Sequence, residues 1–361
     1  MTIFDLVESK AIAMYWNELE SNRIPFLGEG LFPAQKKVGL DLSWLKGSNQ
    51  LPVALMPSAF DAKPTLRDRI GVTRVETELP FFREAMRIGE KDRQLLLQFI
   101  NNANSNYLTD AVRKIYNDAK TLLDGALVQP ERMRMSLLVN GKISIVAPND
   151  KGVFVSYNYD YDKDGTWAAK NTGALLTTAQ WSAPATANPI QDILDIKRKM
   201  SVNYGVTVTR AILTTKTWMY LMNCESIKKD MNVVNGQNII LTDSMLQQYL
   251  LGKTGIVFAV YDKMYKDEAG VQKQYYPDNY VTFLPSYSLG QTYFATTPEE
   301  ADLMSGQLSD ASVSIVNTGI AILTKKESLP VNVITSVSEI VLPSFERMDD
   351  VYTLHVSTQG E

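Results

Sequence analysis

Residues 129–143 read QPERMRMSLLVNGKI, and the pattern of the chain changes from helical to extended within this stretch. Before it, between residues 108 and 126, apolar side chains recur at steps of three and four, which predicts one apolar seam along a long helix. Pro130 has no backbone N–H and is expected to weaken or kink the end of that helix. Asn140 and Gly141 predict a turn before the next strand. The stretch therefore predicts a long helix joined to a sheet by a tight turn.

The sequence before this helix, residues 25–87, has little core-forming pattern. Six prolines divide it, and the runs 38–45 and 72–79 between them have the character of short strands. Two such strands predict a ribbon, and a two-stranded ribbon is only marginally stable alone in water. We therefore expect this stretch to be an extended loop that lies on another chain.

An amphipathic helix is predicted at residues 2–20, with two apolar stripes. Its partner is either its own domain or a neighbouring subunit, and the sequence leaves both open. The stripes consist of Phe4, Val7, Ala11 and Met14, and of Ile12, Trp16 and Leu19.

After the long helix the chain alternates between helices and strands. Residues 166–188 form a polar connection, and Asn188 followed by Pro189 predicts the start of a helix that ends before Gly205. Helices and strands alternate up to residue 306, and the remainder returns to strands. We therefore predict an α+β protein in which a block of residues 188–306 is inserted into a domain built from the segments on either side.

The composition excludes the commoner catalytic and metal chemistries. The 361 residues include one histidine, His355, and one cysteine, Cys224. A structural zinc site needs three or four ligands of this kind, and a histidine-dependent nucleophile would rely on a residue near the end of the chain. The formal net charge of -4 does not indicate a basic nucleic-acid-binding domain, and no apolar run reaches the roughly 18 residues of a membrane span. We expect no enzyme, no cofactor and no membrane partner.

One acidic motif is a candidate metal site. Asp160, Asp162, Asp164 and Gly165 have the spacing that opens an EF-hand calcium loop, but the twelfth position is Asn171 where that loop needs a bidentate glutamate. A solvated acidic turn is the first interpretation, and a bound cation is the weaker candidate.

Four motifs, in order along the chain, resemble those of tailed-bacteriophage major capsid proteins of the lambda capsid protein E family. The resemblance extends from about residue 25 to residue 345. The motifs are Leu31-Phe32-Pro33, then QPERM with LLVNGKI within residues 129–143, then Tyr265-x-Asp267-x-x-Gly270 with Tyr276-Pro277-Asp278 and VTFLP at 281–285, and last Thr297-Pro298-Glu299-Glu300.

The resemblance implies the Hong Kong 97-like phage capsid fold, which is α+β. It assigns the predicted elements to named parts of that fold. These parts are an N-terminal arm (1–24), an extended β-ribbon loop (25–87), the first part of a peripheral domain with a long spine helix (88–187), an inserted axial α/β domain (188–306), and the return of the chain to the peripheral domain (307–361).

The function that this resemblance implies is structural. It is the function of a major capsid protein that assembles with its own copies, as hexamers and pentamers, into an icosahedral shell around phage double-stranded DNA. Further implied partners are a portal protein, a scaffolding protein and, as an additional candidate, a decoration protein, with the DNA held without sequence specificity. Assembly is expected in the host bacterial cytoplasm, and the mature protein is expected in the virion.

Two alternatives stay open at this point, and the contact residues are themselves hypotheses. One alternative is an encapsulin-like compartment shell, and the other is a soluble α/β enzyme with a carboxylate-only site. The candidates for contacts between subunits are Phe4, Val7, Trp16, Leu42, Trp44, Leu45, Val72, Arg74 and Glu76.

Overall fold

The computed structural model describes residues 8–18, 26–46, 73–91, 94, 105–148, 154–232, 240–305, 311–328 and 331–359. The chain divides into two compact units. The first unit is drawn from Met1–Leu42, Glu76–Met133 and Gln291–Ser344, and the second from Ser43–Val75, Arg134–Gly290 and Phe345–Glu361. Both units are therefore discontinuous in sequence.

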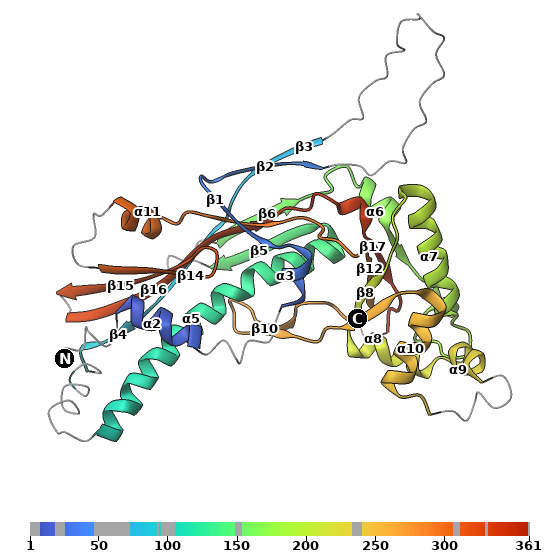
Figure 1. The fold of residues 1–361 in the computed structure, drawn as a ribbon, viewed down its shortest axis with the longest axis horizontal. Coiled ribbons are helices and arrows are strands. Elements are labelled where there is room, and N and C mark those ends of the chain that lie inside the picture. Colours follow the sequence, from blue (N-terminus) through green and yellow to red (C-terminus); the bar gives the residue numbers. More distant parts are fainter. Residues whose placement is uncertain are drawn as a thin grey trace, which may run out of the picture. The chain divides into compact units, whose positions relative to one another are not determined.

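A six-stranded sheet forms the first unit, with β14, β15 and β16 side by side in Figure 1. Its strands, in order, are β1 (Ala34–Lys37), β13 (Thr292–Ala295), β16 (Val331–Pro343), β15 (Ile320–Ser328) and β14 (Ala311–Val316), and β4 (Phe81–Ile88) also pairs with β16. β1 runs parallel to β13, and the other pairs are antiparallel. The long strand β16 pairs with β15 and β4 on its two sides and therefore joins segments far apart in the sequence.

The amphipathic helix predicted near the N-terminus is present as α2 (Ser9–Glu18), and it packs on its own unit. Ile12 and Trp16, from the second predicted stripe, are buried among side chains of the long helix and of the sheet. Met14, from the first stripe, is 58% exposed. Of the two partners left open, the described part of this helix uses its own domain. The stripe residues outside the described part of the chain are Phe4, Val7 and Leu19.

The long helix predicted from residues 108–126 is α5 (Ser105–Asn140), and it continues for ten residues past Pro130. A proline inside a helix costs roughly 3 kcal/mol. Four side chains in the turns that follow are fully buried: Met133, Met135, Leu137 and Leu138. Burial of one such side chain contributes about 1.5–3 kcal/mol, so together they outweigh the proline. The predicted turn follows at Gly141, which has a φ of 64° and donates its N–H to the Leu137 carbonyl.

The second unit has a five-stranded sheet with helices packed against it. Its strands, in order, are β7 (Thr172–Ala174), β17 (Tyr352–His355), β12 (Tyr280–Leu284), β8 (Arg210–Leu213) and β9 (Val257–Val260). Its main helices are α7 (Pro189–Tyr204), α8 (Thr215–Asn223), α9 (Glu225–Met231) and α10 (Asp243–Thr254) (Figure 1). The core between them includes Trp181, Ile193, Met200, Leu221, Leu246 and Phe283. Helices and strands alternate here within residues 188–306, and the sheet also takes in β7 and β17 from outside that range.

Smaller elements complete the second unit. They are two antiparallel hairpins and three short helical segments. The hairpins are β5 (Lys142–Pro148) with β6 (Phe154–Asp160) and β10 (Met264–Lys266) with β11 (Gln272–Gln274); the helical segments are α6 (Thr166–Asn171), η2 (Thr177–Ala179) and η4 (Met348–Asp350).

Helix α7 begins and ends where its capping residues predict. The side chain of Asn188 accepts the N–H of Gln191, and Pro189 is the first helical residue. At the other end, Gly205 has a φ of 68° and donates its N–H to the Ser201 carbonyl at 3.0 Å. Each of these signals lies within a few residues of the helix end that it sets.

The strand β17 differs from the predicted domain order. The resemblance assigned residues 307–361 to the peripheral domain together with residues 88–187, but β17 also pairs with β12, which lies within the predicted axial block 188–306. Tyr352 and Leu354 belong to the core of that unit. Thr353, between them in sequence, is also buried and donates its hydroxyl to the Leu138 carbonyl at 2.8 Å. Because both faces are buried, this strand is an interior strand of the second sheet.

The residue boundaries of the compact units also differ from those of the predicted domains. They divide near residues 133 and 290, whereas the predicted boundaries fall after 187 and 306. The assignment of peripheral and axial domains stays a prediction.

In the described part of the chain, no helix combines the length and apolarity needed to span a bilayer.

Candidate functional site

The ribbon predicted for residues 25–87 is present in part. β2 (Asp41–Lys46) and β3 (Thr73–Glu78) form a two-stranded sheet, and residues 47–72 between them lie outside the described part of the chain. The flanks of the ribbon differ from the prediction, because β1 and β4 belong to the six-stranded sheet of their own chain. The prediction of a loop on another chain is therefore wrong for these two strands, and what remains of it is residues 38–80.

The root of this ribbon packs on its own chain. Trp44 of β2 stacks on Tyr161, with ring centroids 5.1 Å apart, and Leu42 is buried. Trp16 is buried as well, so three of the predicted contact residues are interior side chains and offer little surface to a neighbouring copy. The placement of the other candidate side chains lies outside what the structure describes, and they stay predictions: Phe4, Val7, Leu45, Val72, Arg74 and Glu76.

Two buried carboxylates lie at the first turn of α11 (Pro298–Ser305). Thr297 caps this helix, because its hydroxyl accepts the N–H of Glu300 at 3.3 Å. Glu299 and Glu300 are each 6% exposed. The N-terminal end of a helix carries partial positive charge, which favours negative side chains there, but two neighbouring buried carboxylates still need cationic partners.

The cationic partners come from the two strands that flank the ribbon. Lys36 of β1 forms an ion pair with Glu300 at 2.5 Å, and Arg83 of β4 forms one with Glu299. Ser338 of β16 donates its hydroxyl to Glu299 at 2.8 Å. These five residues, Lys36, Arg83, Glu299, Glu300 and Ser338, are named the carboxylate clamp. The clamp connects both flanks of the ribbon to one helix end.

Sequence reasoning missed the clamp, although one signal for it was present. Thr297 and Glu300 have the spacing of a capping box, which marks a helix start. The two cations lie more than 200 residues away in the sequence, and no local pattern connects them to the motif.

A buried glutamate from the QPERM motif has a similar structural role. Glu131 is fully buried in α5 and accepts the N–H of Gly28 at 3.0 Å, in the first turn of α3 (Leu27–Leu31). The residue before that helix, Phe26, makes no side-chain cap. Glu131 therefore supplies the cap that the local sequence lacks, which gives this motif a physical reason.

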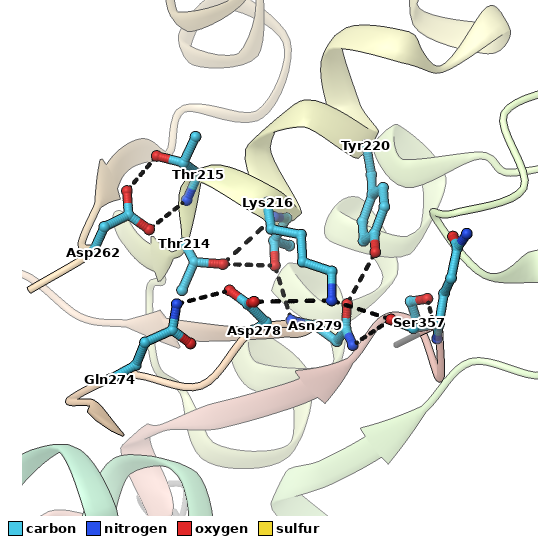
Figure 2. Close-up of polar contacts among 11 residues, drawn as sticks. Thr214, Thr215, Lys216, Tyr220, Asp262, Gln274, Asp278, Asn279 and Ser357 are labelled. Atoms are coloured by element: carbon cyan, nitrogen blue, oxygen red, sulfur yellow. Dashed lines mark hydrogen bonds and ion pairs between the residues drawn. The ribbon is translucent and has the colours of Figure 1, made fainter. Parts of the chain in front are cut away.

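Figure 2 shows a polar network in the second unit, where the parallel strands β8 and β9 end. Asp262 follows β9 and accepts hydrogen bonds from the backbone N–H (2.8 Å) and the hydroxyl of Thr215, at the first turn of α8. Open α/β sheets commonly bind ligands at the carboxyl ends of their strands, and helix N-termini attract anions. Here the chain's own carboxylate takes that position.

The rest of this network holds the C-terminal segment. Lys216 donates to the Gln359 carbonyl at 3.1 Å and lies 3.8 Å from the carboxylate of Asp278. Asn279 donates to the same carbonyl at 3.2 Å and accepts the hydroxyl of Tyr220 at 3.1 Å (Figure 2). The backbone of Asn279 is left-handed, with a φ of 67°. The charged groups are thus engaged inside the chain, and the arrangement fastens the end of the chain to α8.

The single histidine and the single cysteine both serve in packing. His355 stacks on Tyr280 across the β17–β12 pair, with ring centroids 4.5 Å apart. Cys224 is fully buried, and its Sγ lies 3.4 Å from the Ala187 carbonyl.

The three aspartates of the acidic motif bind backbone groups. Both carboxylate oxygens of Asp162 accept N–H groups at the start of α6, from Trp167 and Ala168, each at 2.8 Å. Asp160 accepts the N–H of Asp162, and Asp164 accepts both the N–H (3.3 Å) and the hydroxyl (3.0 Å) of Thr166. These are the hydrogen bonds of an acidic turn that caps a helix. Among the described residues, no group of three or more histidine, cysteine, aspartate or glutamate side chains is arranged to hold a metal ion.

Comparison with protein families finds one match along nearly the whole chain. The model of the family described as Phage major capsid protein E matches residues 8–349. No curated protein sequence matches the chain with significance.

Solved structures share the fold along their full length. A phage-related protein from Bordetella bronchiseptica RB50 is 12% identical, with a TM-score of 0.59 over 98% of this chain and 99% of its own. A putative capsid protein of a prophage of Escherichia coli CFT073 is 13% identical, with a TM-score of 0.57 over 97% of this chain and 99% of its own. The likeness at this identity shows the fold, and it confirms the predicted α+β fold class.

Proposed function

The chain belongs to the phage major capsid protein E family, and from this membership we propose how a shell-forming protein uses the parts described above. It is a capsid protein of the virion that associates with copies of itself into a shell. The observation that carries this conclusion is the family match over residues 8–349.

We propose that the ribbon of β2 and β3, with residues 47–72, contacts an adjacent copy in the shell. A two-stranded sheet is marginally stable by itself, so a long ribbon gains from a surface beyond its own chain. Trp44 and Leu42, at the base of the ribbon, are buried against their own chain. The rest of the ribbon is the part that we propose contacts a neighbouring copy. Many modest contacts of this kind, repeated by symmetry, are enough to stabilise a closed assembly.

The two compact units suit two further roles in the same shell. We propose that the second unit acts as the axial domain, which meets its copies in hexamers and pentamers, and that the first unit acts as the peripheral domain. The shell would enclose double-stranded DNA without sequence specificity. Its assembly in the host cytoplasm would involve portal and scaffolding proteins, with a decoration protein as a further candidate.

A structural role without catalysis is also part of the proposal. The soluble-enzyme alternative needs free carboxylates in a site, and the natural place for one is the end of β8 and β9. There, Asp262 accepts a hydrogen bond from Thr215, and Asp278 forms an ion pair with Lys216 (Figure 2). Both carboxylates therefore already have partners within the chain. An encapsulin-like shell is less well supported, because the family that matches the chain is one of phage capsid proteins.

Removal of residues 47–72 tests the role of the ribbon. A short Gly-Ser linker in their place keeps β2 joined to β3, and we expect a folded, soluble subunit that forms no shells in negative-stain electron microscopy. Circular dichroism and gel filtration would show that the subunit is folded. A second variant with a Gly-Ser linker of the original length separates the effect of contacts from that of loop length.

A surface substitution far from the ribbon in sequence provides the control. Lys120 and Asp124 form an exposed ion pair on α5 in the first unit, and Asp124→Asn is expected to leave shell formation intact. Shells of normal size and yield from both linker variants would contradict the role proposed for the ribbon.

A further inference from the structure

The strands that flank the ribbon have little apolar contact with their own sheet. The side chains of β1 are exposed or half-buried at all four positions, and those of β4 are exposed at five of eight and half-buried at the others. Backbone pairing to β13 and β16 remains, with the ion pairs of the carboxylate clamp added to it. Because apolar burial is small, these strands depend on the backbone pairing and on the ion pairs of the clamp.

The clamp is nearly symmetric about the ribbon. Lys36 lies five residues before Asp41, where β2 begins, and Arg83 lies five residues after Glu78, where β3 ends. Both cations reach adjacent glutamates on the first turn of α11. One helix end therefore fixes the chain at equal distances before and after the ribbon.

Buried carboxylates make this connection sensitive to loss of a partner. Removal of one partner of a buried ion pair leaves an uncompensated charge, which is more costly than replacement of both charges. Lys36 also donates to the Ala295 carbonyl at 3.4 Å, and Arg83 lies 4.6 Å over the ring of Phe81. These contacts orient the two cations toward the glutamates.

From this geometry we propose that the carboxylate clamp is a positioning device, which fixes the direction in which the ribbon leaves its subunit. The inference rests on the proposed function, in which the ribbon contacts an adjacent copy. Loss of the clamp leaves the subunit folded and the ribbon present, with Trp44 and Leu42 still packed, but β1 and β4, the strands before and after the ribbon, are held less firmly. The ribbon then meets its neighbour in varied orientations, and regular shells become rare.

The test combines hydrogen exchange in the unassembled subunit with electron microscopy of assembly. In the double variant Glu299→Gln with Glu300→Gln, we expect amide exchange in residues 34–37 and 81–88 to be at least tenfold faster. Amide exchange in the core strands of the second unit should be unchanged. The yield of regular shells should fall at least tenfold. The exchanged pair Lys36→Glu with Glu300→Lys keeps an ion pair between β1 and α11. Its amide exchange and its yield of regular shells should therefore lie closer to the parent protein than those of the double variant. Glu225→Gln, which removes an exposed ion pair with Lys229, is the matched control.

The possible results separate this inference from the proposed function. Unchanged exchange at both strands in the double variant would refute the clamp. Faster exchange with normal shells would refute its positioning role, and if the linker variants then fail to assemble, the role of the ribbon itself still stands. Should the double variant not fold, the single variants Glu299→Gln and Glu300→Gln each remove one buried charge and leave only a partly exposed cation unpaired, and they are judged by the same two readouts.

Discussion

Gly141 and Gly165 share one backbone conformation and differ in their surroundings. Their φ angles are 64° and 67°, in the left-handed region that L side chains rarely adopt. A Cβ at Gly141 would lie 2.5 Å from the end of Met348 and 3.0 Å from the ring of Trp167, whereas a Cβ at Gly165 would meet nothing within 4 Å. The flexible methionine can move aside, but the ring is held by a hydrogen bond from its Nε1 to the Met348 carbonyl.

This difference predicts unequal costs for the same substitution. Gly165→Ala should lower the free energy of unfolding by about 1 kcal/mol, from backbone strain alone. Gly141→Ala should lower it by about 2–4 kcal/mol, because overpacking against the tryptophan adds to the strain. Urea denaturation of the unassembled subunit, followed by tryptophan fluorescence, measures both. Equal losses in the two variants would show that the space around Gly141 can relax.

At the scale of elements, the β10–β11 hairpin depends on one carboxylate at its turn. Asp267 pairs with Lys273 at 2.8 Å and accepts the N–H of Val271 at 2.8 Å. The hydrogen bond from Lys273, together with those from backbone N–H groups, lowers the pKa of Asp267. A lowered folded pKa means that this carboxylate stabilises the hairpin above a pH of about 4, and that the contribution is lost as the pH falls through the folded pKa.

The predicted consequence is a titration that depends on Lys273. In Lys273→Ala, the midpoint for the Asp267 carboxyl, followed by carbon NMR, should move up toward its ordinary value. The Val271 amide should also exchange faster at a given acidic pH than in the parent protein. Lys266→Ala, an exposed residue on the same hairpin, serves as the control and should leave the midpoint in place. An unmoved midpoint in Lys273→Ala would exclude the ion pair as the cause.

Elements with local signals could be predicted, and those that depend on distant partners could not. Asn188 and Gly205 set both ends of α7 through their own hydrogen bonds, so sequence was sufficient. Pro130 carries a local signal against helix, and the burial of the turns after it overrides that signal. β1 looked like part of a free ribbon because its pairing partner, β13, lies more than 250 residues later.

The same reasoning applies to the whole molecule and to its candidate sites. The α+β class followed from the order of helical and extended patterns, and the family followed from motifs spread along the chain. The carboxylate clamp did not follow, since it assembles side chains from β1, β4, β16 and α11. The contact residues chosen for their apolar character proved to be interior at Trp16, Leu42 and Trp44, because burial in the chain's own core is the commoner use of such side chains.

At the largest scale, the second unit is complete only when residues 352–355 have joined its sheet. β17 pairs with β7 on one side and β12 on the other, so its removal divides the sheet. Removal of this segment also removes three buried side chains: Tyr352, Leu354 and Val356. Burial of each contributes about 1.5–3 kcal/mol to the stability of the folded unit. Their sum is a large part of the roughly 5–15 kcal/mol by which a domain is stable.

Truncation at two positions turns this into a prediction. A chain that lacks residues 352–361 should lose the second unit and form no shells, whereas one that lacks only residues 360–361 should assemble as the parent does. Circular dichroism of the soluble fraction and electron microscopy of assembly measure the two effects. Because the first unit's sheet contains no residue after Ser344, its own amides should stay protected in the longer truncation. Regular shells from that truncation would mean that β7 and β12 hold the sheet together without β17.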